Sequence, residues 1–142
     1  MSDVIAEGAL ALSRRLRRGE LSCRDLMALT LDRIAVKDGT FNAIPILADG
    51  DALMREAAVC DEEIARGHWR GWVHGIPQAI KDLAHAKGLR TTWGSPLFAD
   101  FVATEDSIHV ARMRAAGALI IGKTNTPEFG LGSHTYNSLH GL

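Results

Sequence analysis

Apolar residues recur every three or four positions in three segments of the chain, which is the spacing of an amphipathic helix. The first segment covers residues 5–16 and has Gly19 as its natural end. The second is predicted over residues 22–36, because Ser22 begins a capping pattern. The third covers residues 53–64. The apolar positions of the first and third helices are Ile5, Ala9, Leu12, Leu16, Leu53, Ala57, Cys60 and Ile64.

Short apolar runs mark three candidate strands, at residues 42–48, 76–80 and 118–121. A further helical pattern over residues 104–116 lies between the last two strands and ends at Gly117. Helices followed by strand, helix and strand predict an α/β fold, with a mixed, partly parallel sheet flanked by helices.

Length and composition are those of one ordinary domain, which we divide into a helical segment, 1–40, and the start of an α/β core, 41–142. The 142 residues are 46% hydrophobic and 23% charged, with a net charge of −1. Because acidic and basic residues are interleaved, we expect no direct contact with nucleic acid and no membrane surface. The first residues lack a secretory pattern, so the cytoplasm is the default location.

The cysteines and histidines show no metal-binding pattern. Cys23 and Cys60 lie far apart in helical segments and are interpreted as reduced core residues. The histidines have no ligand spacing.

Residues 117–124, GALIIGKT, match the phosphate-binding loop pattern literally. In a true phosphate loop the strand precedes the first glycine and a helix follows the lysine. Here the strand lies between the glycines, so Gly117 is interpreted as a helix C-cap and Lys123 as the polar end of a core strand. Nucleotide binding is kept only as a minor alternative.

The apolar run 76–80 ends in Lys81, which is followed at once by Asp82. Burial disfavours the charged form of an amine, so a lysine at such a position can act as a base toward a serine hydroxyl. A solvated or ion-paired lysine is the alternative. Asp82 would favour the charged lysine, and alternation along a strand points the two side chains to opposite faces. Asp82 is therefore interpreted as structural, capping the following turn.

The segments around Lys81, the helix ending RAAG, and residues 118–132 (ALIIGKTNTPEFGLG) occur in an order and spacing that resemble the N-terminal part of amidase signature enzymes. The resemblance implies hydrolysis of a carboxylic amide by a serine, cis-serine and lysine triad, with no metal or organic cofactor. Lys81 would be the triad lysine, and small residues of the following loop would lie near the substrate. The implied substrate-binding residues are Gly130, Leu131, Gly132 and Ser133.

The resemblance also assigns supporting roles. Residues 91–95 would brace the loop after the lysine strand through backbone hydrogen bonds, and Ser95 would be a satisfied hydroxyl, not a nucleophile. His134 departs from the small or hydroxyl residue expected beside Ser133. Independently of the resemblance, three large aromatic residues are expected to pack on the sheet or cover its edge, with lining of the substrate entrance as the alternative: Trp69, Trp72 and Trp93.

The nucleophilic and bridging serines of the family lie downstream of a turn that corresponds to residues 137–141. The chain is therefore expected to be the N-terminal portion of a single amidase domain, inactive alone, with a hydrated Lys81. Its partners would be a small-molecule amide and the remainder of the amidase chain. The family often forms dimers, so a homodimer stays open. A non-catalytic assembly module with an amidase-like half-fold is the other alternative.

Overall fold

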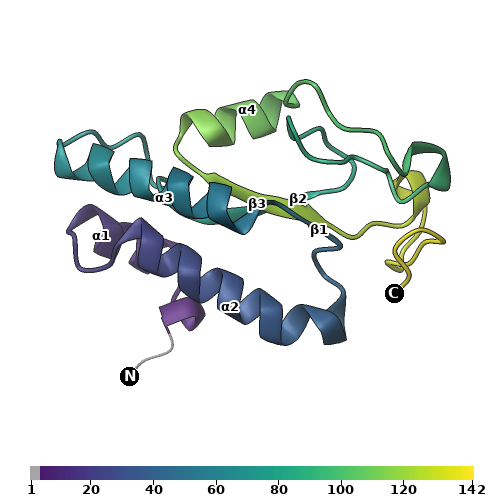
Figure 1. The fold of residues 1–142 in the computed structure, drawn as a ribbon, viewed down its shortest axis with the longest axis horizontal. Helices are drawn as coiled ribbons and strands as arrows, with labels where there is room; N and C mark the ends of the chain where they lie inside the picture. Colours follow the sequence, from purple (N-terminus) through teal and green to yellow (C-terminus); the bar gives the residue numbers. More distant parts are fainter. Residues whose placement is uncertain (1–3) are drawn as a thin grey trace.

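The computed structural model describes residues 4–142, which form helices and a small sheet (Figure 1). The α-helices are α1 (Ala9–Arg17), α2 (Cys23–Phe41), α3 (Gly50–Ala65) and α4 (Ile108–Ala115). The strands are β1 (Ile46–Leu47), β2 (Pro77–Lys81) and β3 (Leu119–Thr124). Short 3-10 helices are η1 (Val4–Ala6), η2 (Pro96–Phe98) and η3 (Glu128–Gly130). Among these residues, no helix is both long and apolar enough to cross a membrane.

The sheet has the strand order β1-β3-β2, with β1 antiparallel and β2 parallel to the central β3. The predicted mixed, partly parallel sheet is confirmed. The connection from β2 to β3 contains α4, as a parallel pair requires a long crossover. Figure 1 shows α4 and α2 on opposite sides of the strands.

Helix α2 begins as predicted but ends later. The Ser22 hydroxyl accepts a hydrogen bond from the Asp25 amide at 2.9 Å, which caps the first turn. The helix continues to Phe41 and ends at Asn42, which adopts the left-handed conformation with φ 47°. The predicted end near residue 36 was wrong. The residue that ends the helix is Asn42, and no residue near 36 acts as a C-cap.

Three other predicted elements were too long. The helix expected over residues 5–16 divides into η1 and α1, because Gly8 is extended and lies at the N-cap. The strand expected over residues 42–48 pairs only at β1, since Pro45 has no amide to donate to a ladder.

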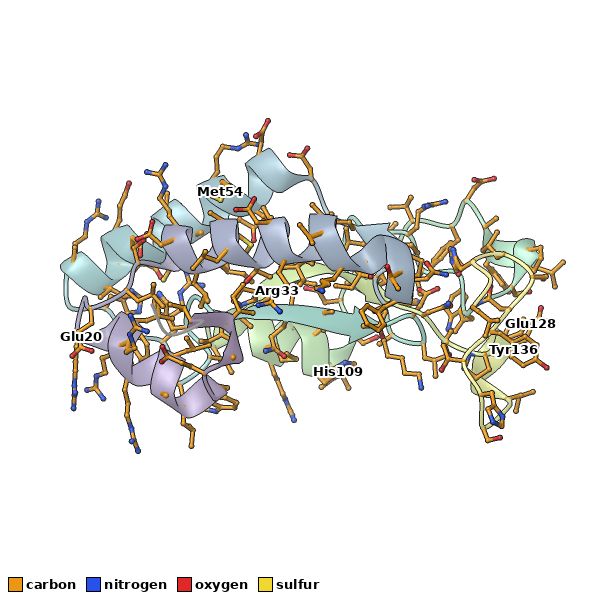
Figure 2. The ribbon with its side chains drawn as sticks, turned by 90° about the horizontal axis from the view of Figure 1, so that it is seen from below. Glu20, Arg33, Met54, His109, Glu128 and Tyr136 are labelled. Atoms are coloured by element: carbon orange, nitrogen blue, oxygen red, sulfur yellow. The ribbon has the colours of Figure 1, made fainter. Side chains whose placement is uncertain are left out.

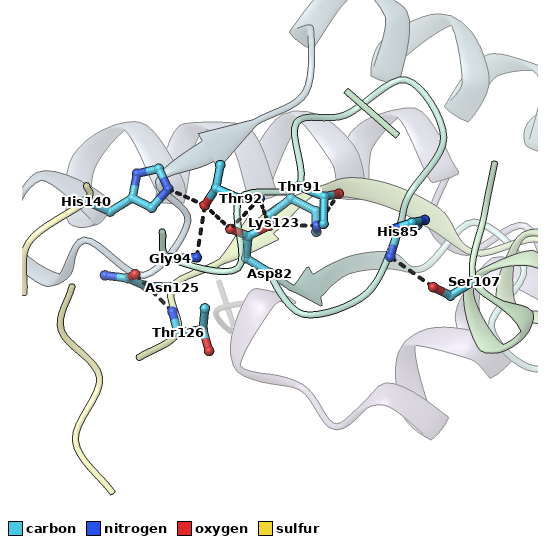
Figure 3. Close-up of polar contacts among 10 residues, drawn as sticks. All are labelled: Asp82, His85, Thr91, Thr92, Gly94, Ser107, Lys123, Asn125, Thr126 and His140. Atoms are coloured by element: carbon cyan, nitrogen blue, oxygen red, sulfur yellow. Dashed lines mark hydrogen bonds and ion pairs between the residues drawn. The ribbon is translucent and has the colours of Figure 1, made fainter. Parts of the chain in front are cut away.

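The helix expected over residues 104–116 begins only at Ile108. The side chains before it bond to the backbone of another loop. Asp106 Oδ1 accepts from the Lys87 amide at 2.6 Å. Ser107 Oγ accepts from the His85 amide at 2.9 Å, as Figure 3 shows. Polar side chains used in this way compete with helix formation, and here they fasten the segment after β2 to the start of α4.

The core lies between the helices and the sheet, and α2 packs along α3. Gly117 closes α4 with φ 90°, and a Cβ there would lie 2.9 Å from His74 Cα. Its predicted role as a helix C-cap is confirmed. The largest fully buried apolar side chains are Leu16, Met27, Leu53 and Val110.

Candidate active site

The candidate site lies where the carboxyl ends of β2 and β3 meet. Lys81 and Thr124 are register partners, and the Asp82 amide donates to Thr124 O at 3.1 Å, which extends the ladder by one residue. Ligands of parallel sheets bind at this end of the strands. Figure 1 shows the loop after β2 and the C-terminal segment gathered at the same end of the molecule.

Lys81 is the last residue of β2, and its side chain is exposed. The residues on either side, Ile80 and Asp82, are buried, as strand alternation requires. The predicted place of Lys81 at a strand end is confirmed. Its role as a base remains a prediction.

Asp82 is fully buried and forms an ion pair with Lys123, not with Lys81 (Figure 3). Lys123 Nζ lies 2.9 Å from Asp82 Oδ1 and donates a second hydrogen bond to Thr91 Oγ1 at 2.9 Å. The structural role predicted for Asp82 is supported, but the carboxylate joins two strands and a loop and does not merely cap a turn.

Thr92 completes the hydrogen bonding of Asp82. Its amide donates to the carboxylate at 3.1 Å, and its hydroxyl also donates to Oδ2. The same hydroxyl accepts from the Gly94 amide at 3.1 Å and lies 3.1 Å from His140 Nε2. Because the hydroxyl proton is used by Asp82, His140 Nε2 must carry the proton in this contact.

Burial lowers the pKa values of the two basic side chains in this network, Lys123 and His140. Burial lowers the pKa of Lys123, and the hydrogen bond and charge of Asp82 partly restore it. We interpret the pair as ionic, because a 2.9 Å contact with additional donors on the carboxylate is typical of a charged pair. Burial also lowers the pKa of His140, which Asp82 raises and Arg90 lowers to smaller extents.

The phosphate-loop alternative is wrong. Residues 122–124 belong to β3, and Lys123 is fully buried against Asp82. The amides that would have to cradle a phosphate lie in the strand, so the lysine and the backbone are both unavailable to a nucleotide.

The predicted substrate loop begins at η3 and lies beside the end of β2. The Phe129 amide donates to Trp93 O at 2.7 Å, and a Cβ on Gly130 would lie 2.9 Å from Leu83 Cδ1. Leu83 follows Lys81 by two residues, so Gly130 is packed against the loop that leaves the lysine strand.

Leu131, Gly132 and Ser133 line a cavity of ≈ 530 Å³ together with Glu128 and Tyr136. Figure 2 shows Glu128 and Tyr136 at one end of the molecule, far from Glu20 at the other. Gly130 does not line this cavity. The Ser133 hydroxyl lies 3.1 Å from His134 Nδ1, and both side chains are exposed. Their contact with a substrate remains a prediction.

The loop from residue 91 to 95 is braced largely as expected. The Thr91 amide donates to Phe101 O and the Ser95 amide donates to Thr92 O, both at 2.9 Å. One expectation was wrong: Ser95 Oγ is buried and has no hydrogen-bond partner among the described residues.

The tryptophans differ in environment. Trp93, with φ 50°, packs in an aromatic cluster with His85, Phe98 and Phe101. Trp69 stacks on the His74 ring with centroids 5.0 Å apart. Trp72 is 57% exposed and does not lie in the core.

Cys60, Glu63 and His74 offer ligand atoms within 4.8 Å of one another, a grouping that the sequence spacing did not reveal. These groups are already engaged. Glu63 forms an ion pair with Arg70, His74 Nδ1 accepts from the Arg70 amide at 3.1 Å, and Nε2 faces Cys60 O at 3.3 Å. A metal at Nε2 would move the ring proton to Nδ1, against the Arg70 N–H. We therefore interpret the cluster as structural.

Sequence reasoning missed the Lys123 and Asp82 pair. The available signal was a lysine within an otherwise apolar strand, because a buried lysine needs a carboxylate partner. Its partner could not be identified without the strand register.

Comparisons with known proteins agree on one family. A family profile described as Amidase matches residues 25–142. The chain is 45% identical over 119 residues to a glutamyl-tRNA(Gln) amidotransferase subunit from Alkaliphilus metalliredigens, covering 84% of this chain and 24% of that protein. It is 43% identical to the corresponding protein from Desulforapulum autotrophicum, covering 97% and 27%.

Solved structures give the same result. The native peptide amidase from Stenotrophomonas maltophilia superposes with a TM-score of 0.86 at 33% identity, covering 96% of this chain and 29% of that chain. A 6-aminohexanoate cyclic dimer hydrolase complexed with substrate gives 0.83 at 27% identity, covering 99% and 27%. The chain thus spans about a quarter of the length of the two amidotransferase relatives. With the fold, the family profile and these likenesses in agreement, the chain belongs to the Amidase family.

Proposed function

We propose that the chain supplies the general base of an amide hydrolase and that Lys81 is this base. The observation that carries the proposal is the position of Lys81 in a member of the Amidase family. Its exposed side chain ends β2 at the sheet edge where β3 leads into the predicted substrate loop. Residues 1–142 would be the N-terminal portion of a single amidase domain.

In the proposed mechanism the serines come from outside these residues. A neutral Lys81 takes a proton, through a bridging serine, from a nucleophilic serine that attacks the amide carbonyl. Collapse of the tetrahedral intermediate breaks the C–N bond as the leaving nitrogen takes up the proton held by Lys81. This step forms an acyl-enzyme and releases ammonia or an amine. Water then releases the acid. No organic or metal cofactor takes part in these steps.

The substrate in this proposal is a small carboxylic amide. The relatives are named for amidotransferase, peptide amidase and cyclic-dimer hydrolase activities. The proposed substrate-side residues are Gly130, Leu131, Gly132 and Ser133. The net charge of −1 favours no direct contact with nucleic acid. The partner would be the remainder of the amidase chain, in the cytoplasm, with a homodimer as a further possibility.

The experiment compares residues 1–142 alone with a longer protein that also contains the downstream amidase region, here called the full-length enzyme. Release of ammonia or amine is measured over a panel of aliphatic, aryl and peptide amides. We expect hydrolysis by the full-length enzyme and none by residues 1–142. Absence of hydrolysis across the panel, with no acyl-enzyme trapped by hydroxylamine, would favour the non-catalytic module.

A further inference from the structure

A lysine that works as a base must give up its proton, but Lys81 is followed directly by a carboxylate. Asp82 is the next residue in the chain, and although its side chain lies on the opposite, buried face of the strand, a buried charge is only weakly screened. A nearby negative charge favours the protonated form of an amine. Left alone, Asp82 would therefore oppose the proposed chemistry.

Lys123 is placed to cancel this charge. Its ammonium lies 2.9 Å from Asp82 Oδ1, and neither side chain is exposed. Charges interact more strongly in such a weakly polar interior than in water. Seen from Lys81, the ionised pair is a dipole and not a net negative charge.

The strand register keeps Lys123 off the face of Lys81. Without the irregularity between Gln78 and Ala79, the ladder that pairs Gln78 with Ile120 would bring Lys81 opposite Lys123. With it, Lys123 lies opposite Ile80, and Thr124 lies opposite Lys81. A shift of one residue exchanges the two faces of a strand. Lys123 consequently shares the buried face with Ile80 and Asp82.

No other described group neutralises Asp82 in this way. Thr92 is hydrogen-bonded to Asp82 directly. Thr91 is hydrogen-bonded to Lys123, and His140 to Thr92, so these two residues are linked to Asp82 only indirectly. The threonines carry no charge, and burial lowers the pKa of His140, so this ring is neutral at neutral pH. The Arg90 guanidinium donates to Ala99 O at 3.4 Å instead. Lys123 is the one cation in residues 4–142 that bonds to this carboxylate.

We propose that Lys123 is a positioning residue for catalysis: by pairing with Asp82, it removes the negative field that would keep Lys81 protonated. The inference rests on the proposed function, since it takes Lys81 as the base.

The test is the dependence of kcat/KM on pH in the full-length enzyme, because this profile reports ionisations of the free enzyme. Lys123→Gln keeps amide donors for Asp82 and Thr91 but removes the charge. Its acid limb should move to higher pH by about 0.5 to 1 unit. Lys123→Arg, which keeps the charge, should leave the limb in place. Lys123→Gln with Asp82→Asn removes both charges and should restore it.

A loss of packing alone would lower kcat/KM at every pH without moving the limb, and this result would overturn the inference. A shift that persists in the double variant would overturn it as well. If Lys123→Gln does not fold, Asp82→Asn alone decides, since a limb that moves upward there contradicts the assigned sign. Lys81→Ala separates this inference from the proposed function. An active Lys81→Ala enzyme refutes the proposed function. If Lys81→Ala is inactive but the acid limb of Lys123→Gln does not move, only this inference is refuted.

Discussion

Lys123 Nζ lies 2.9 Å from Asp82 Oδ1, and both side chains are fully buried. Removing one member of such a pair leaves an uncompensated charge in the interior. Lys123→Met should therefore lower the free energy of unfolding by about 3 to 5 kcal/mol, measured by urea denaturation. Lys123→Met with Asp82→Asn should cost clearly less than Lys123→Met alone. A loss below about 1 kcal/mol for Lys123→Met would show that the pair is not a significant structural element.

One buried histidine, His74, and one half-buried histidine, His140, predict destabilisation in acid. Burial lowers the pKa of His74 and of His140, so the unfolded chain takes up protons that the folded chain refuses. Their contribution is fully present above the unfolded pKa of about 6.5 and falls with decreasing pH, by at most about 1.4 kcal/mol per pH unit for each histidine. Urea denaturation between pH 7 and pH 5 measures this slope.

The control for this slope is a matched pair of variants. His74→Phe keeps a ring to stack on Trp69. It should reduce the dependence of the unfolding free energy on pH by up to the amount that the uptake of one proton contributes. His109→Phe changes an exposed ring on α4, labelled in Figure 2, and should leave the slope unchanged. Equal slopes in the wild type and His74→Phe would contradict the prediction.

The two cysteines should be unreactive in the folded protein. Both are free and buried. The hydrogen bond to Cys60 together with burial raises the pKa of the Cys23 thiol, whereas the hydrogen bond with Cys23 lowers the pKa of Cys60, so Cys60 is shielded by its buried position alone. A chromogenic disulfide reagent should detect no thiol in native buffer and two in urea. Ala65→Cys, exposed at the end of α3, should react at once. Rapid native reaction of Cys23 would contradict its buried position.

Ser133 tests the predicted substrate loop in the full-length enzyme. Its exposed hydroxyl lines the cavity beyond η3, so Ser133→Ala should raise KM by about 2- to 10-fold, the worth of one hydrogen bond. Stability should not change. Thr104→Ala removes an exposed hydroxyl before α4 and serves as the control. An unchanged KM in Ser133→Ala would remove this side chain from the substrate site.

Much of the fold could be predicted from local patterns. The apolar spacing of α3 and the capping pattern at Ser22 are encoded in neighbouring residues, and both are confirmed. The start of α4 could not be predicted, because Ser107 bonds to the His85 amide in a distant loop. Local patterns carry no information about such partners.

In the candidate site, too, some features follow from the local sequence and others depend on distant contacts. The place of Lys81 at a strand end follows from the apolar run before it. The partner of Asp82 depends on a ladder irregularity between Gln78 and Ala79, which sets which face Lys123 occupies.

The most direct test of the central claim is the amide hydrolysis rate of full-length Lys81→Ala beside Lys87→Ala. Both lysines are exposed, and Lys87 lies six residues further along the chain. Loss of the base should reduce kcat/KM by at least about 10²-fold in Lys81→Ala, with an unchanged circular dichroism spectrum. Lys87→Ala should retain wild-type activity. Full activity in a folded Lys81→Ala enzyme would show that Lys81 is not the base.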